Sequence, residues 1–138
     1  MKKLIALIVA FLTFNLYGQN YKSYNVTTKN RSTSTMIWNS NNENWDFFDN
    51  GDLESYDVEW KLVLDLTGDN GTIVGNNVTF DVKGIETKKT EDGDDMVVIR
   101  ATTTRSQNDV IIILTRLSGD SLILALYDHK ARKVFYYR

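Results

Sequence analysis

The fold is decided by residues 56–66, which read YDVEWKLVLDL. Apolar and polar side chains alternate along this stretch: Val58, Trp60 and Leu62 fall on one side, and charged residues fall between them. A period of two residues is typical of a β-strand with one buried face and one solvated face. We therefore expect a long half-buried strand here, with Trp60 in the core.

The same period continues through most of the chain and is interrupted at short intervals by clusters of Gly, Asn and Asp. Such clusters form turns, and the segments between them are too short to hold crossover helices. The sequence therefore predicts an all-β domain, an antiparallel meander that forms a small lipocalin-like barrel or a sandwich. The other expected strands are residues 23–29, 35–39, 72–74, 78–85, 96–104, 110–117, 121–128 and 133–138.

The start of the chain has the order of a secretory signal peptide. Two lysines are followed by an apolar stretch at residues 4–16 and then by Gly18 at the expected cleavage site. The apolar stretch is shorter than the roughly 20 residues that a membrane-spanning helix needs. We therefore expect residues 1–18 to be removed and residues 19–138 to form one exported domain, periplasmic or secreted, without a membrane span.

Charge and composition exclude several classes of function. The formal charge of −2 falls to −4 when Lys2 and Lys3 leave with the signal, so no attraction to nucleic acid or anionic lipid is expected. The chain has no cysteine, and its one histidine, His129, lies in a charged turn. A disulfide, a lipid anchor on a cysteine and a zinc site are therefore not expected. We expect a protein that is not an enzyme and that holds no cofactor.

Of three acidic turns, the one at residues 91–95 is the candidate metal site, because its carboxylates are the densest. Calcium binds oxygen ligands, but this turn lacks the twelve-residue pattern with a closing glutamate. Asp and Gly are also the residues that a tight turn requires, so an ordinary turn is the alternative interpretation. The carboxylates concerned are Glu91, Asp92, Asp94 and Asp95.

Aromatic residues are concentrated before the long strand. Trp38 precedes a polar loop at residues 39–44, and Trp45, Phe47 and Phe48 follow it in a segment that is expected to be a strand or a single helical turn. Large aromatic side chains usually belong to a core. Beside a polar loop they are freer to be exposed, and they can then line a surface for a ligand or a partner. We take these four residues as the candidate binding surface.

Three expected strands are apolar on both faces, and they comprise residues 96–99, 110–114 and 122–126. A strand of this kind needs cover on both sides, and it would promote aggregation if one face were left open. The cover is either the aromatic N-terminal third of the same chain or another protein, which includes a second copy of this one. The sequence leaves both alternatives open.

Several features together are shared with a known group of proteins: the lysine-led signal ending Tyr17-Gly18-Gln19, Trp38 and Trp45 across a polar loop, the strand ending Leu64-Asp65-Leu66, the acidic turn and the aromatic C-terminus. With them the chain resembles the small exported β-rich proteins of unknown function that are common in Bacteroidetes-type bacteria. The resemblance implies export and a β fold, and it implies no activity.

The expected function is that of an exported, non-catalytic binding or interaction domain, whose partner is an envelope protein or a second copy. A lipocalin-like carrier of a small apolar ligand is the alternative, and a small hydrolase comes third. A cavity of roughly 300 Å³ or more with apolar walls and a few polar groups would favour the carrier. A flat, exposed apolar face would favour a partner.

Overall fold

A computed structural model describes residues 21–116 and 122–138, so the expected signal peptide lies outside the described residues. No helix in this part of the chain has the length and apolar character needed to cross a membrane. All of its regular elements are strands: β1 (Tyr21–Asn39), β2 (Asn44–Asp65), β3 (Asn70–Gly75), β4 (Val78–Lys89), β5 (Asp95–Thr103), β6 (Asp109–Arg116), β7 (Leu122–Asp128) and β8 (Lys133–Tyr137).

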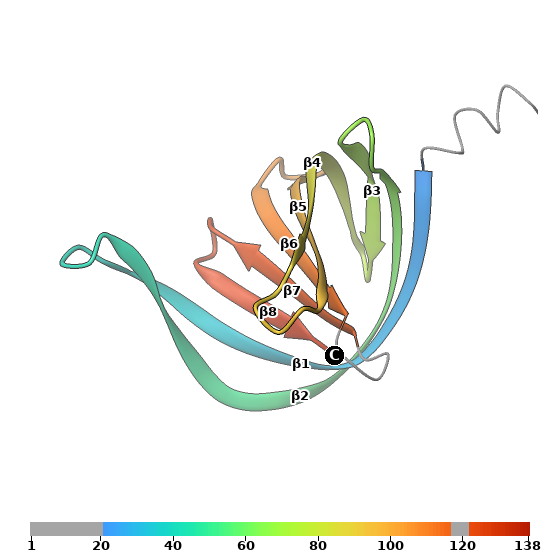
Figure 1. The fold of residues 1–138 in the computed structure, drawn as a ribbon. Coiled ribbons are helices and arrows are strands. Elements are labelled where there is room, and N and C mark those ends of the chain that lie inside the picture. Colours follow the sequence, from blue (N-terminus) through green and yellow to red (C-terminus); the bar gives the residue numbers. More distant parts are fainter. Residues whose placement is uncertain (1–20, 117–121) are drawn as a thin grey trace, which may run out of the picture.

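The strands form one antiparallel meander that closes on itself (Figure 1). Each strand pairs with the next, and β8 returns to pair with β1, so that Arg31 lies opposite Tyr137 and Thr35 opposite Lys133. The predicted meander is confirmed, and of the two alternatives the structure is the closed barrel and not the sandwich. Closure removes most of the free strand edges that an open sheet would expose.

The interior of the barrel is filled by the alternating apolar residues that the sequence marks. Leu62, Leu64 and Ile73 have no exposed surface. Trp60 is also buried, as predicted, and its indole Nε1 donates a hydrogen bond to Thr28 Oγ1 at 3.1 Å. This bond satisfies two polar groups that would otherwise destabilise the core.

The strand predictions are confirmed outside the N-terminal third, apart from small differences at the ends. Residues 23–29 and 35–39, expected as two strands, belong to a single β1 of 19 residues. Residues 45–48 belong to the 22-residue β2, so the helical-turn alternative is wrong. The polar residues between the expected strands continue the ladder with β2 through two register shifts, and residues 31–35 also pair with β8. These backbone hydrogen bonds do not require apolar side chains.

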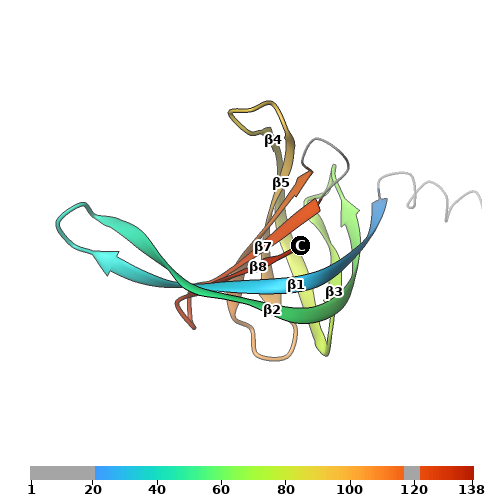
Figure 2. The ribbon, with the colours of Figure 1, turned by 90° about the horizontal axis from the view of Figure 1, so that it is seen from below.

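The β1–β2 hairpin extends far beyond the barrel (Figure 1). We call its projecting part, residues 34–49, the arm; its strands pair from Ser34 opposite Asp49 to Asn39 opposite Asn44. A shorter hairpin, formed by β4 and β5, projects from the barrel in a different direction (Figure 2). The two hairpins make the molecule much less compact than a simple barrel.

The arm provides part of the cover for the strands that are apolar on both faces. Their inner faces are buried in the barrel, as Ile99, Ile112 and Leu124 show. Val134 and Ala125 are also buried, but they lie outside the main core cluster, on the outer face of β7 and β8. Met36 of the arm shares this outer position and is 2% exposed. The N-terminal third therefore covers a portion of the second face.

Candidate functional site

The predicted aromatic residues come together on the arm. Trp38 and Trp45 lie opposite each other across the two strands, with their rings in an edge-on contact at 5.3 Å. Phe47 lies opposite Met36, and Phe48 opposite Thr35. Cross-strand pairs of large side chains stabilise a two-stranded ribbon. The sequence thus identified a real cluster, and the structure adds that it belongs to a projecting hairpin.

Most of these side chains are exposed to solvent. Trp38 is 49% exposed, Phe47 49% and Phe48 52%, whereas Trp45 is half-buried. The structure adds two residues that the sequence analysis did not identify, Ile37 and Leu53, at 51% and 58% exposed. Leu53 gave a weak signal because it stands between Asp52 and Glu54, and Ile37 lay within an expected strand, between Met36 and Trp38.

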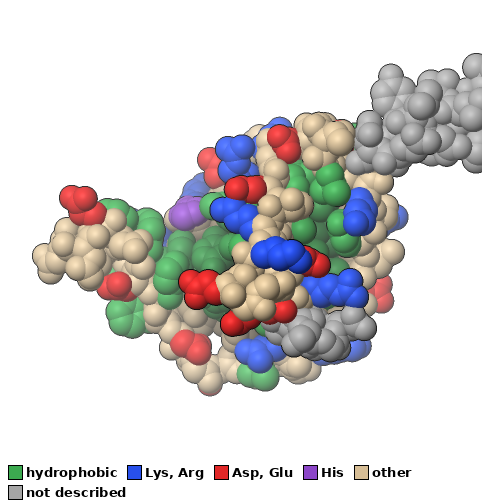
Figure 3. All heavy atoms as spheres, viewed as in Figure 1, with side chains coloured by type: hydrophobic (Ala, Val, Ile, Leu, Met, Phe, Trp, Pro, Cys, Tyr) green, Lys and Arg blue, Asp and Glu red, His purple; other side chains and the backbone are tan. Residues whose placement is uncertain are grey.

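The two faces of the arm differ in what they contact. One face turns toward the barrel, where the Phe47 ring meets Tyr127 at 6.1 Å and the Trp45 ring meets His129 at 6.3 Å. The other face carries Phe48, which points away from this contact. Apolar side chains also line the space between the arm and the β4–β5 hairpin (Figure 3). The arm thus packs on the barrel with part of one face, and it exposes apolar side chains on both faces, as Phe47 and Phe48 show.

One edge of β2 is open along the arm and its base. On that side β2 pairs with β3 only from Lys61 to Asp65, and no strand in the described part of the chain lies beside the preceding stretch, residues 44–60. The side chain of Asn76 donates a hydrogen bond to the Asp57 carbonyl oxygen at 2.8 Å, which satisfies one group of this edge. An open edge can accept a further strand.

The open edge is also acidic. Residues 44–60 contain six carboxylates and no lysine or arginine. Two of the six are paired with β1: Arg31 lies 2.7 Å from Glu54, and Lys29 lies 3.6 Å from Asp57. The remaining carboxylates are Asp46, Asp49, Asp52 and Glu59.

The acidic turn between β4 and β5 does not gather its carboxylates around a point. Within residues 21–116 and 122–138, no three His, Cys, Asp or Glu side chains are placed to hold a metal ion. The backbone N–H of Asp94 bonds to the Thr90 hydroxyl, and Asp95 pairs with Lys89 at 2.7 Å. These contacts fit the ordinary turn, and the geometry lends no support to calcium at Glu91, Asp92, Asp94 and Asp95.

A cavity of about 410 Å³ opens at one end of the barrel. Its size, its apolar walls and its few charged groups meet the condition set above for a carrier, and its place in the fold was not predicted from the sequence. Because its residues come from five strands and from the residue that follows β2, only the closed fold brings them together. The lining residues are Lys22, Tyr24, Leu66, Thr87, Lys88, Asp95, Met96, Val97, Leu114, Arg116 and Leu122.

The shifted pKa values have structural causes. Burial raises the pKa of Tyr137, whose ring packs on Trp60, and burial also raises the pKa of Tyr127. The pKa of Asp65 is lowered, first by the hydrogen bond from the Gly68 N–H. His129 is exposed in the turn between β7 and β8, as expected. These groups are spread over the molecule and do not share one cleft.

Comparison of the chain with protein-family models, with curated proteins and with solved structures found no match in any of the three. The resemblance to small exported proteins of Bacteroidetes-type bacteria therefore stays a prediction. The candidate sites are defined by the geometry of this chain alone: the aromatic arm with its open acidic edge, and the cavity at the end of the barrel.

Proposed function

We propose that this chain is an exported, non-catalytic interaction domain that binds a partner protein on its arm. The observation that supports this most directly is the concentration of exposed apolar side chains there. Of the large apolar side chains exposed in the described part of the chain, four lie on the arm and a fifth, Leu53, lies just beyond it on β2. Exposed apolar patches of this kind mark interaction sites in soluble proteins. The five exposed side chains are Ile37, Trp38, Phe47, Phe48 and Leu53.

The partner in this proposal contributes an extended basic segment. Strand addition at the open edge of β2 would satisfy its unpaired backbone groups, and the exposed Phe48 beside this edge would supply apolar contact. The acidic residues of the edge favour lysine and arginine on the added strand. A second copy of this chain would instead bring acidic residues against acidic residues, so charge disfavours a homodimer through this edge.

Affinity capture from an envelope extract tests the proposal when it is run with matched variants. Wild-type protein should retain a partner that the double variant Trp38→Ser/Phe48→Ser loses. The control variant is Val74→Ser, because Val74 is 41% exposed on β3, outside the arm. Capture should also weaken as salt is raised, because screening reduces attraction between exposed charges.

Two results would overturn the proposal. The first is capture that is unchanged in the double variant. The second is a wild-type protein that captures nothing and runs as a monomer in size-exclusion chromatography with light scattering. A stable dimer that the double variant abolishes would replace the heterologous partner with a second copy.

A further inference from the structure

At one end of the barrel, two strands carry rows of inward-facing apolar side chains, and the last residue of each row is a lysine or an arginine. On β1, Tyr24 packs against the core, and Lys22 stands two residues nearer the end of the strand. On β6, Leu114 is buried, and Arg116 stands two residues further on. Alternate residues of a strand point to the same side. Both cations therefore belong to rows that face inward, at positions where a filled barrel would carry apolar residues.

These cations border the cavity of about 410 Å³ described above. Its volume lies in the range of small-molecule sites, which are mostly apolar with a few polar groups that orient the ligand. Further along the same rows, Val26 of β1 and Ile112 of β6 are buried, so the cavity ends there and is no through-channel. Its apolar wall is formed by Tyr24, Leu66, Met96, Val97, Leu114 and Leu122.

The charge around this cavity is opposite to that of the chain as a whole. Lys22, Lys88 and Arg116 line it together with a single carboxylate, Asp95, in a protein of formal charge −2. Asp95 is itself held by Lys89 at 2.7 Å. Its negative charge is therefore matched by a cation that does not line the cavity. Lys88 is in turn paired with Glu86 at 3.4 Å, so the charge available to a ligand is that of Lys22, which forms no ion pair within the described residues.

We propose that this cavity binds a single-chain anionic amphiphile, with its hydrocarbon chain on the apolar wall and its acidic head at Lys22. The Lys22 Nζ lies 5.7 Å from the centroid of the Tyr24 ring, so its charge sits beside the apolar wall. A neutral ligand would cover Lys22 without neutralising it, and a cationic ligand would be repelled by it. The closed floor limits the chain to short or medium length.

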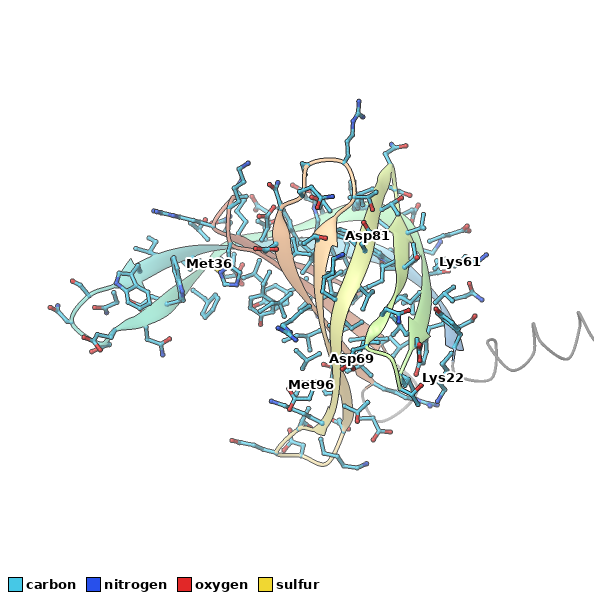
Figure 4. The ribbon with its side chains drawn as sticks, turned by 90° about the horizontal axis from the view of Figure 1, so that it is seen from above. Lys22, Met36, Lys61, Asp69, Asp81 and Met96 are labelled. Carbon is cyan, nitrogen blue, oxygen red and sulfur yellow. The ribbon has the colours of Figure 1, made fainter. Side chains whose placement is uncertain are left out.

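The proposal concerns a different surface from the arm and does not depend on a protein partner. Met36 marks the base of the arm in Figure 4, and Lys22 and Met96 mark the cavity well away from it. The arm variant Trp38→Ser/Phe48→Ser should therefore bind the amphiphile as well as wild type does. Failure of one proposal leaves the other standing.

Isothermal titration calorimetry on the full chain tests the ligand class with four compounds that share a ten-carbon chain. Decanoate, decyl phosphate, decanol and decyltrimethylammonium are each titrated below their critical micelle concentrations. Decanoate should bind one to one with a dissociation constant below about 1 mM. Decanol should bind at least about five-fold more weakly, and the cation should not bind. Comparison of decanoate with decyl phosphate decides between a carboxylate and a phosphate head.

Matched lysine variants test the position of the head. Lys22→Gln should weaken decanoate about five-fold and leave decanol unchanged. Lys61→Gln is the control, because Lys61 is exposed on β2 and does not line the cavity (Figure 4). Leu66→Ser should weaken both compounds, because Leu66 belongs to the wall and is already 37% exposed, so that its loss does not threaten the fold.

Three results would overturn the proposal. One is the absence of saturable heat with both decanoate and decyl phosphate. Another is equal affinity for decanoate and decanol together with no effect of Lys22→Gln. The third is an equal loss in Lys22→Gln and Lys61→Gln, which would show general attraction to positive charge and no defined site.

Discussion

The barrel and the arm are built from the same two strands, yet they place a tryptophan in opposite surroundings. Trp60 of β2 is 3% exposed, donates a hydrogen bond to Thr28 and packs edge-on against Tyr137. Trp38 of β1 is 49% exposed and packs edge-on against Trp45, its cross-strand partner. The pairing of β1 with β2 continues past both residues. Local strand structure is therefore the same where burial differs most.

What differs is the number of neighbouring strands. Beside Trp60, β3 begins to pair with β2, and the other strands of the barrel close over the inner face. Beyond Thr35, β1 has no further ladder pairs with β8, so the arm is a two-stranded ribbon from Met36 outward. Alternation decides the side to which a residue points, whereas burial requires another element on that side.

The largest effect is expected where the contrast is sharpest, at Trp60. Trp60→Ala should lower the free energy of unfolding by about 3–5 kcal/mol, because it leaves a cavity among buried side chains. The change also deprives the buried Thr28 hydroxyl of its hydrogen-bond donor. Urea unfolding followed by circular dichroism measures the loss. A loss below about 1 kcal/mol would show that the barrel interior is less tightly packed than the structure indicates.

A second, smaller effect is expected at Gly75, where β3 approaches the same indole. A Cβ atom at this position would lie 2.7 Å from Cζ3 of Trp60. Gly75→Ala should therefore destabilise the protein by about 1–3 kcal/mol through overpacking. In the Trp60→Leu background, which removes the outer ring, the cost of Gly75→Ala should fall. Additive losses in this double-mutant cycle would contradict the close approach.

A third prediction concerns pH and the turn that ends β2 on the barrel side. Asp65 accepts hydrogen bonds from the Gly68 N–H, the Thr67 hydroxyl and the Thr67 N–H, and these lower its pKa. Because the folded pKa lies below the unfolded value of about 3.9, this contribution to stability is present above that value. It is lost as the pH falls through the folded pKa.

Thermal unfolding between pH 7 and pH 2 measures this dependence. Asp65→Asn keeps a side-chain oxygen that can accept hydrogen bonds but removes the charge, so the acid-induced decrease in melting temperature should become shallower. Asp92→Asn, a change in the exposed β4–β5 turn, serves as the control. If both variants changed the pH dependence of the melting temperature equally, the prediction that Asp65 contributes specifically would be wrong.

The barrel could be predicted from the sequence to a large extent, because apolar and polar residues alternate along most of its strands. The alternation in residues 56–66 correctly predicted which side chains of β2 point into the barrel. The short turns allowed only antiparallel pairing between successive strands. The choice between barrel and sandwich could not be made, because it depends on the pairing of β1 with β8, which lie at opposite ends of the chain. The single long β1 was missed because its middle is polar, and its hydrogen bonds to β2 need no apolar face.

The candidate sites divide in the same way. The aromatic cluster was predictable because Trp38, Trp45, Phe47 and Phe48 flank one turn and are near each other in sequence. The cavity at the end of the barrel was not, because residues as distant as Lys22 and Leu122 meet only after closure. Alternation alone also gave no sign of the cavity. Lys22 and Arg116 occupy inward-facing positions at the ends of strands, where the pattern predicts apolar residues.

The smallest effect on stability is expected at Trp38, and this makes it the clearest test of the comparison. Trp38→Ser removes an edge-on contact with Trp45 on a ribbon that opens locally. The free energy of global unfolding should therefore change by no more than about 0.5 kcal/mol. Hydrogen exchange of the arm amides should become faster while that of β6 and β7 is unchanged. A loss as large as that of Trp60→Ala would mean that the arm unfolds together with the barrel core. The exposed aromatic residues would then be needed for stability, and their exposure would no longer support a partner-binding surface.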